Sequence, residues 1–184
     1  MTRETLQELF VEHIRDIYDA EKQLVKALPK LSKAAESEDL ASGLQSHLEE
    51  TQNQVTRLEQ VFELLGEPAK AKTCKAMKGL IEEGDEAASE EQGELRDLAI
   101  IAAAQKVEHY EMSAYGTACA IADRLGLDDA VELLRQTEEE EKNADEKLTS
   151  VAMSLYDSLD SSDETEAAGV GVKASTQGER KPTR

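Results

Sequence analysis

The chain has 184 residues, enough for one domain with a sizeable core and too few to expect two. Aromatic residues make up only 3% of it, while Ala, Leu, Glu, Lys and Gln dominate, so the composition predicts an all-α fold. The formal charge of −19, without a basic patch, argues against nucleic acid as a partner and favours cations. With no apolar stretch of about 18 residues and no signal-peptide profile, we expect a cytoplasmic protein that has no membrane partner.

The first predicted helix runs from about residue 2 to residue 36 and carries an apolar stripe at alternating spacings of four and three. The stripe passes from Ile17 through Glu21 to Leu24, so an acid occupies a position where a buried leucine is expected. Pro29 should kink this helix or weaken one of its turns.

The second predicted helix covers residues 40–65 and stops at Gly66, with Pro68 just beyond. Only a short break at residues 37–39 separates it from the first helix, so the two should form an antiparallel hairpin. Residues 67–93 lose the pattern except in one short amphipathic piece around Met77. This segment should be a long connection that contains a short helix.

A second hairpin follows, with helices at about residues 94–124 and 128–159. The stripe of the earlier helix includes Glu111, with Glu108 on its shoulder, and that of the later helix includes Glu138, Glu141 and Asp145. Beyond residue 159 the apolar period disappears. We therefore expect one domain over residues 1–159 and a disordered polar tail over residues 160–184.

Two helical hairpins joined by one long crossover are typical of a ferritin-like four-helix bundle, because simple up-and-down bundles have short loops throughout. The acids can be placed along this bundle at 1.5 Å per residue. Glu21 and Glu50 then lie roughly 20 to 24 Å from the first turn, and Glu108 and Glu141 roughly 22 to 28 Å from the second. All four helices can thus bring carboxylates to one layer near mid-bundle.

A buried ionised carboxylate costs several kcal/mol unless it is paired, protonated or bound to a metal. Fe²⁺ and Mn²⁺ suit carboxylate and imidazole ligands, and bridging carboxylates can hold two such ions. The candidate ligands, which share the layer or lie one helical turn from it, are Glu21, His47, Glu50, Glu108, Glu111, Glu141 and Asp145. Glu138 falls a turn away from the layer.

Some of these residues also fit a role outside a metal site. His47 and Glu50 flank the stripe of their helix, so solvated side chains account for them as well as ligands do. Three tyrosines, Tyr18, Tyr110 and Tyr115, lie within about a turn of candidate ligands. They could donate hydrogen bonds to the ligand carboxylates, or be ordinary boundary residues of a bundle.

Several motifs resemble the YciE/YciF ferritin-like family of bacteria. They are residues 19–24 (DAEKQL), 26–31 (KALPKL), 46–52 (SHLEETQ), 102–111 (AAAQKVEHYE) and 140–142 (EEK) with Asp145, and the resemblance covers about residues 3–156. It implies a ferritin-like bundle with a dinuclear metal site, usually a homodimer, that is associated with stress responses.

The chain departs from the Glu-x-x-His motif that many ferritin-like proteins carry in helices two and four. Glu50 is followed three residues on by Asn53, and Glu141 by Ala144. Any histidine ligand must then be His47. This predicts a set of metal ligands richer in oxygen than in the ferroxidase relatives.

These features predict a protein that binds two iron or manganese ions per chain and protects the cell under stress, with possible ferroxidase- or peroxidase-like activity. The alternative is a helical scaffold or interaction protein without redox turnover. An iron-storage shell ranks lowest, because the resemblance points to dimers.

Overall fold

The computed structural model describes the backbone of residues 2–170 and the side chains of residues 2–159. Over that range the chain forms five α-helices and no strand. The helices are α1 (Arg3–Ala34), α2 (Glu38–Leu65), α3 (Lys75–Ala87), α4 (Glu94–Leu125) and α5 (Asp128–Val170). Among the described residues, none of them combines the length and the apolar character that crossing a lipid bilayer requires.

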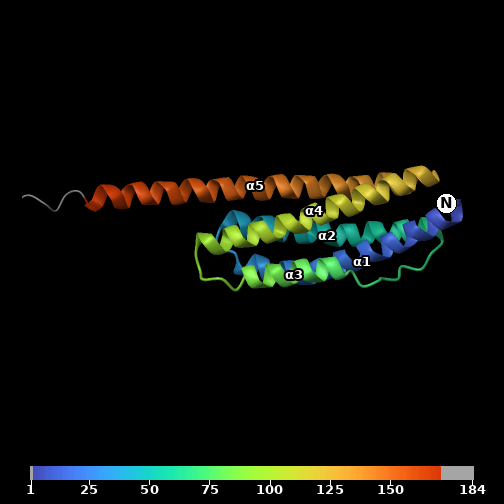
Figure 1. Cartoon of the computed structure of the whole chain (residues 1–184), viewed down its shortest axis with the longest axis horizontal. Helices are drawn as coiled ribbons and strands as arrows, with labels where there is room; N and C mark the ends of the chain where they lie inside the picture. The colour runs from blue at the N-terminus through green and yellow to red at the C-terminus, as the bar shows by residue number, and fades with distance from the viewer. Residues whose placement is uncertain (1, 171–184) are drawn as a thin grey trace, which may run out of the picture.

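The four long helices form two hairpins that pack against each other (Figure 1). Within the hairpins α1 packs on α2 and α4 on α5, and between them α1 packs on α4 and α2 on α5. The crossover after α2 contains α3, which lies against α1 and α4. The predicted all-α, ferritin-like bundle with a short helix in a long crossover is confirmed.

Local signals in the sequence begin and end these helices. Thr2 and Ser37 cap α1 and α2, and the side-chain oxygen of each accepts a hydrogen bond from the backbone N–H three residues on. Gly66 and Gly126 end α2 and α4 in the left-handed conformation, with φ of 67° and 70°. Helix α1 continues through Pro29 to Ala34.

The last helix ends later than the sequence predicts, because α5 continues past residue 159 to Val170. An established helix gains one hydrogen bond for each residue it adds, and residues 160–168 contain neither proline nor glycine. The loss of the apolar stripe therefore did not mark its end. The division into a bundle over residues 1–159 and a tail over residues 160–184 stays a prediction, and residues 171–184 lie outside the described range.

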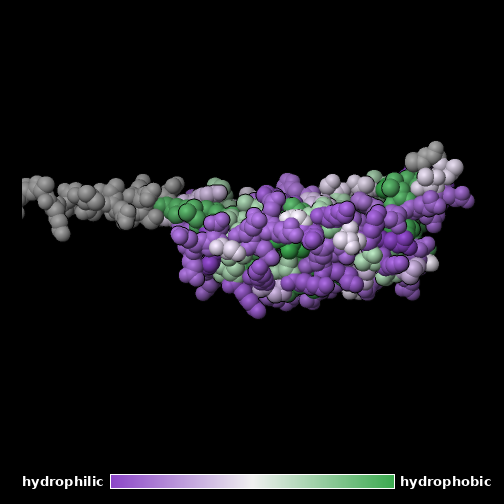
Figure 2. Space-filling view, turned by 60° about the horizontal axis from the view of Figure 1, so that its bottom comes forward, coloured by the Kyte–Doolittle hydropathy of each residue, from purple (hydrophilic) through white to green (hydrophobic). Residues whose placement is uncertain are grey.

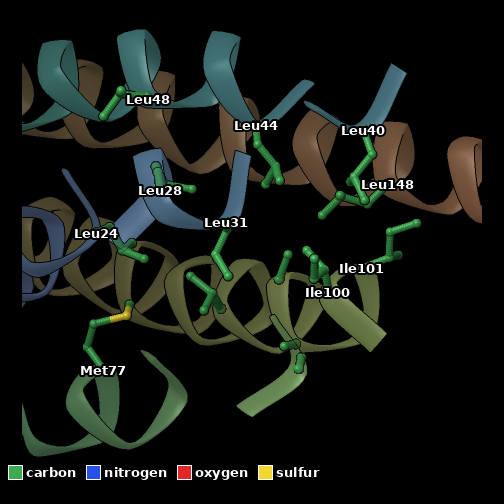
Figure 3. Close-up of a cluster of buried hydrophobic side chains, with 14 of the residues drawn as sticks. Leu24, Leu28, Leu31, Leu40, Leu44, Leu48, Met77, Ile100, Ile101 and Leu148 are labelled. Atoms are coloured by element: carbon green, nitrogen blue, oxygen red, sulfur yellow. The ribbon is translucent and has the colours of Figure 1, made fainter. Parts of the chain in front are cut away.

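The interior of the bundle consists of two apolar clusters. The cluster at the end near α3, here the crossover-end cluster, is drawn in Figure 3 and includes Leu24, Leu28, Leu31, Leu40, Leu44, Leu48, Met77, Ile100, Ile101 and Leu148. The cluster at the other end, here the N-terminal-end cluster, includes Phe10, Ile14, Ile17, Leu58, Val61, Phe62, Tyr115 and Leu134. Four buried acids, Glu21 on α1, Glu108 and Glu111 on α4 and Glu141 on α5, lie where these two clusters meet.

The face of the molecule drawn in Figure 2 is mostly hydrophilic. Large exposed apolar side chains of the described residues lie at its two ends: Leu9 and Leu64 at one, and Leu95, Met153 and Tyr156 at the other. The large exposed apolar side chains thus gather at the ends, and the polar character of the face in Figure 2 is in keeping with the strongly negative formal charge of the chain.

Candidate metal centre

The layer between the two apolar clusters is lined by charged and ionisable side chains from all four long helices. Glu21 comes from α1, His47 from α2, Glu108 and Glu111 from α4, and Glu141 from α5. Glu21 and Glu141 are fully buried, and the other three side chains are at most 7% exposed. We call these five residues the acid layer. Their burial follows from their place on or beside the apolar stripes, since each position is set by the apolar residues a turn away.

Four members of the acid layer lie close enough to share a metal ion. His47, Glu108, Glu111 and Glu141 each offer a ligand atom within 4.8 Å of the others. The Nε2 atom of His47 lies 3.6 Å from Glu108 Oε1 and 3.8 Å from Glu141 Oε2. The buried histidine and glutamates thus form a group that can hold a metal ion.

Many polar atoms in this layer have no hydrogen-bond partner. They are Glu21 Oε2, Glu108 Oε2, both carboxylate oxygens of Glu111, Glu141 Oε2 and both ring nitrogens of His47. A buried polar atom without a partner costs about 1 to 3 kcal/mol, and more if it is charged. Oxygen and imidazole donors of this kind are what Fe²⁺, Mn²⁺ and related cations bind, so the atoms present fit such an ion.

Two other carboxylate oxygens of the layer accept hydrogen bonds from neighbouring side chains. The hydroxyl of Tyr115 donates a hydrogen bond to Glu21 Oε1, and Gln54 donates through Nε2 to Glu141 Oε1. Gln54 also reaches Glu140 Oε2 at 3.2 Å, and Arg57 donates to both oxygens of Glu140 at 2.6 Å. Donors of this kind fix the orientation of carboxylates around a metal.

Gln54 and Arg57 were not predicted from the sequence as hydrogen-bond donors at this site. A signal for Gln54 was present, because His47, Thr51, Gln54 and Leu58 follow one another at spacings of four and three. That stripe is buried, yet the predicted stripe, which shares Thr51 and Leu58 with it, continued from Thr51 to Val55 and so passed over Gln54. Arg57 is a half-buried partner from α2, and its sequence position alone gives no sign of Glu140 on α5.

Of the three tyrosines, one donates to the acid layer. The hydroxyl of Tyr115 on α4 donates to Glu21 on α1. Tyr18 donates instead to Glu59 at 2.8 Å, and Tyr110 donates to Asp16 at 3.0 Å.

Two predicted ligands, Glu50 and Asp145, lie at the edge of the layer. Glu50 Oε2 is 3.5 Å from His47 Nδ1, and the side chain of Glu50 is 33% exposed. Asp145 Oδ1 accepts a hydrogen bond from Gln105 at 3.0 Å. Neither belongs to the group of four whose ligand atoms meet, so their role as ligands stays a prediction.

The acids of the layer favour their protonated forms when no cation is present. Burial raises the pKa of Glu21 to about 8, with a contribution from the charge of Glu141, and burial also raises the pKa of Glu108 to about 8. Burial raises the pKa values of Glu111 and Glu141 well above the ordinary one. For His47, burial opposes the charged form, but the neighbouring carboxylates outweigh it and raise its pKa. A bound cation would displace protons from this layer.

Comparison with known proteins places the chain in a family. The model of a family described as a domain of unknown function (DUF892) matches residues 5–158. The chain belongs to this family. It is also 47% identical over 155 residues to protein YciF of Escherichia coli strain K12, covering 83% of this chain and 93% of YciF. The resemblance to the YciE/YciF proteins predicted from the motifs is thereby confirmed.

Solved structures similar to this chain show the same fold. The crystal structure of the E. coli stress protein YciF superimposes with a TM-score of 0.80 at 45% identity, covering 83% of this chain and 97% of that one. The structure of YcfI from Rhodopseudomonas palustris gives a TM-score of 0.76 at 48% identity, covering 81% and 94%. A Xanthomonas campestris protein shares only 17% identity at a TM-score of 0.65, covering 86% and 99%, so it supports the fold alone.

Proposed function

We propose that this protein binds two iron or manganese ions in the acid layer and protects the cell under stress through Fe²⁺ oxidation or the handling of peroxide. The observation that carries the proposal is the set of buried, unpartnered carboxylate oxygens and imidazole nitrogens that four helices bring together. A purely structural role would leave the cost of this burial without compensation.

In this proposal Glu21, His47, Glu108, Glu111 and Glu141 hold the ions, with Glu50 and Asp145 completing the set from the edge. Two redox-active ions in such a site would supply electrons to oxygen or peroxide. The chain contributes a rigid carboxylate frame, in which Tyr115 orients Glu21 and Gln54 orients Glu141. The apolar clusters above and below the layer keep bulk water away from it.

The relatives support the wider role. The E. coli YciF structure is described as that of a stress protein, and this chain matches 97% of it. A cytoplasmic homodimer, as the family resemblance implies, is part of the proposal. Sedimentation of the purified protein tests the dimer, and cell fractionation tests the location.

Metal content is the direct test. After anaerobic incubation with Fe²⁺ and removal of loosely bound ions, we expect about two ions per chain by elemental analysis. Glu141→Gln should lose at least about half of this metal, because it removes the charge of a proposed ligand. Glu139→Gln is the matched control, since Glu139 is exposed on the same helix two residues away and should leave the metal content unchanged.

Thermal unfolding provides a second measurement on the same samples. Ions at about 100 times their dissociation constant stabilise a protein by about 2.7 kcal/mol, which raises the melting temperature here by about 5 to 10 °C. Less than about 0.5 ion per chain with no change in melting temperature would contradict the proposal and favour a helical scaffold without redox turnover.

A further inference from the structure

One side of the bundle is more open than the side opposite it. Helix α3 covers the groove between α1 and α4, whereas the groove between α2 and α5 has no covering helix among the described residues. A narrow pocket lies in this second groove, and its lining comes from α2, α4 and α5 alone. We call it the α2/α5 pocket.

The α2/α5 pocket reaches the acid layer. Its inner wall includes His47 and Glu108, which are two of the four residues whose ligand atoms meet. The exposed fraction of the side chains increases from the acid layer towards the pocket. Glu21 and Glu111 are at most 1% exposed, His47 is 7% exposed, and the Glu50 side chain at the pocket wall is 33% exposed. The layer therefore approaches the surface through this pocket.

The rest of the pocket wall is largely apolar. Leu40 and Leu44 of α2 face Ala144, Leu148 and Val151 of α5 across it. The charged groups near its outer part partly cancel, because Lys147 Nζ lies 3.7 Å from Glu50 Oε1. Apolar walls disfavour a charged molecule, and the carboxylates at the inner end repel an anion.

The volume of the pocket limits the size of the molecule that can enter it. It is about 40 Å³, and one water molecule needs about 10 to 15 Å³ measured in the same way. An uncharged molecule of two heavy atoms fits this space. A molecule with an aromatic ring does not.

We propose that the α2/α5 pocket is the route by which a small uncharged oxidant, dioxygen or hydrogen peroxide, reaches the acid layer, and that its apolar walls set the size limit. This rests on the proposed function, in which the layer holds redox-active ions. It adds the side from which the reactant enters and the residues that exclude larger molecules.

Gly43 offers a way to close this route without touching the acid layer. It lines the pocket on α2, and a Cβ atom added to it would meet no atom within 4 Å. A leucine there would fit the helix, since leucine is a better helix former than glycine, and would fill space over the pocket. Gly79→Leu on α3 is the matched control, because Gly79 is also helical with open space at its Cβ but lies away from the pocket.

The first experiment uses nitric oxide as an uncharged two-atom probe for the Fe²⁺-loaded protein. Stopped-flow absorbance measures its association rate, and the metal content of each variant is measured on the same sample. We expect Gly43→Leu to slow association by about tenfold or more, and Gly79→Leu to leave it unchanged. Val151→Phe, which narrows the pocket from α5, should also slow association, and it serves as a second variant if Gly43→Leu fails to fold.

Separate mixing with dioxygen and with hydrogen peroxide identifies the oxidant. With peroxide, two Fe²⁺ ions lose one electron each, and the peroxide takes up two electrons and two protons to give two water molecules. With dioxygen, the same two electrons and two protons give hydrogen peroxide. Whichever reaction is faster in the unmodified protein should be slowed in Gly43→Leu and unaffected in Gly79→Leu.

The outcomes separate this inference from the proposed function. Metal-loaded Gly43→Leu and Val151→Phe that bind nitric oxide at the unmodified rate would overturn the access route and leave the metal site standing. An unmodified protein that retains two ions but binds no nitric oxide would also overturn the route alone. Failure to bind metal at all would overturn the proposed function and this inference with it.

Discussion

The acid layer and the N-terminal-end cluster are equally buried, yet their chemistry is opposite. Phe10, Ile14 and Phe62 in the cluster are at most 1% exposed, and their apolar surfaces need only apolar neighbours. Glu21 and Glu111 in the acid layer are just as buried, yet they carry oxygen atoms without hydrogen-bond partners. Burial alone therefore does not separate a core residue from a candidate ligand, whereas the partners of its polar atoms do.

Asp97 sharpens the contrast, because it is a buried acid whose oxygens are satisfied. It is 1% exposed, and it accepts hydrogen bonds from the backbone N–H groups of Glu36 at 3.0 Å and Ser37 at 2.7 Å. It thereby ties the start of α4 to the turn between α1 and α2. A buried carboxylate with partners for both oxygens is explained by the fold alone, and one without them is a candidate ligand.

The largest change in the free energy of unfolding should come from a substitution in the N-terminal-end cluster. Phe10→Ala removes a fully buried ring and should lower the free energy of unfolding by about 3 to 5 kcal/mol, because it leaves a cavity as well as losing apolar burial. Urea denaturation followed by circular dichroism measures this. Leu9→Ala is the control: its side chain is 53% exposed, and the change should be within about 0.5 kcal/mol. Equal losses for the two variants would contradict the description of the cluster.

The next largest effect is expected in the acid layer, where a substitution should raise the free energy of unfolding and not lower it. In metal-free protein, Glu21→Leu should raise the free energy of unfolding by about 1 to 4 kcal/mol, since it replaces an incompletely satisfied buried acid by an apolar side chain of similar size. The same variant should lose bound metal and the stabilisation that metal provides. Melting curves with and without Fe²⁺ measure both effects.

Asp97→Leu is the matched variant for this second prediction. It should destabilise the metal-free protein by about 1 to 3 kcal/mol, because two backbone N–H groups lose their acceptor. Its metal content should stay that of the unmodified protein, since Asp97 lies outside the acid layer. If both variants shift stability in the same direction, the distinction between satisfied and unsatisfied buried acids fails.

Much of the fold could be predicted because apolar periodicity and turn residues are local signals. The stripe through Ile17, Glu21 and Leu24 indicated both a helix and an acid on its buried face, and Gly66 indicated where α2 ends. Counting residues from two short turns then placed the acids at one level, since helices rise by a constant amount per residue. These predictions needed no knowledge of contacts between helices.

Features that depend on contacts between helices were missed. The hydrogen bonds from Gln54 to Glu141 and from Arg57 to Glu140 join α2 to α5, and no local pattern specifies them. The role of Asp97 depends likewise on the turn that packs beside it. The late end of α5 was missed because the prediction used the apolar stripe to mark the helix end, and a helix can continue without one.

The last expected effect, which needs no substitution, is the pH dependence of stability in metal-free protein. Burial raises the pKa of Glu21 and Glu108 from 4.5 to about 8 in the folded state. Between these values the folded chain holds protons that the unfolded chain has released, so stability is present below pH 4.5 and is lost as pH rises towards 8. The raised pKa of His47 acts in the same direction above its ordinary value of 6.5.

We therefore expect the melting temperature of chelator-treated protein to be markedly lower at pH 8.5 than at pH 5.5. The exposed acid Glu12, whose hydrogen bond to Lys72 lowers its pKa, changes stability only below its ordinary pKa of 4.5 and so lies outside this window. Glu21→Leu should flatten the slope, because it removes one of the protons involved, whereas Phe10→Ala should lower the whole curve and keep its slope. A melting temperature that rises over this range, or an unchanged slope in Glu21→Leu, would show that the acid layer does not hold its protons in the folded state.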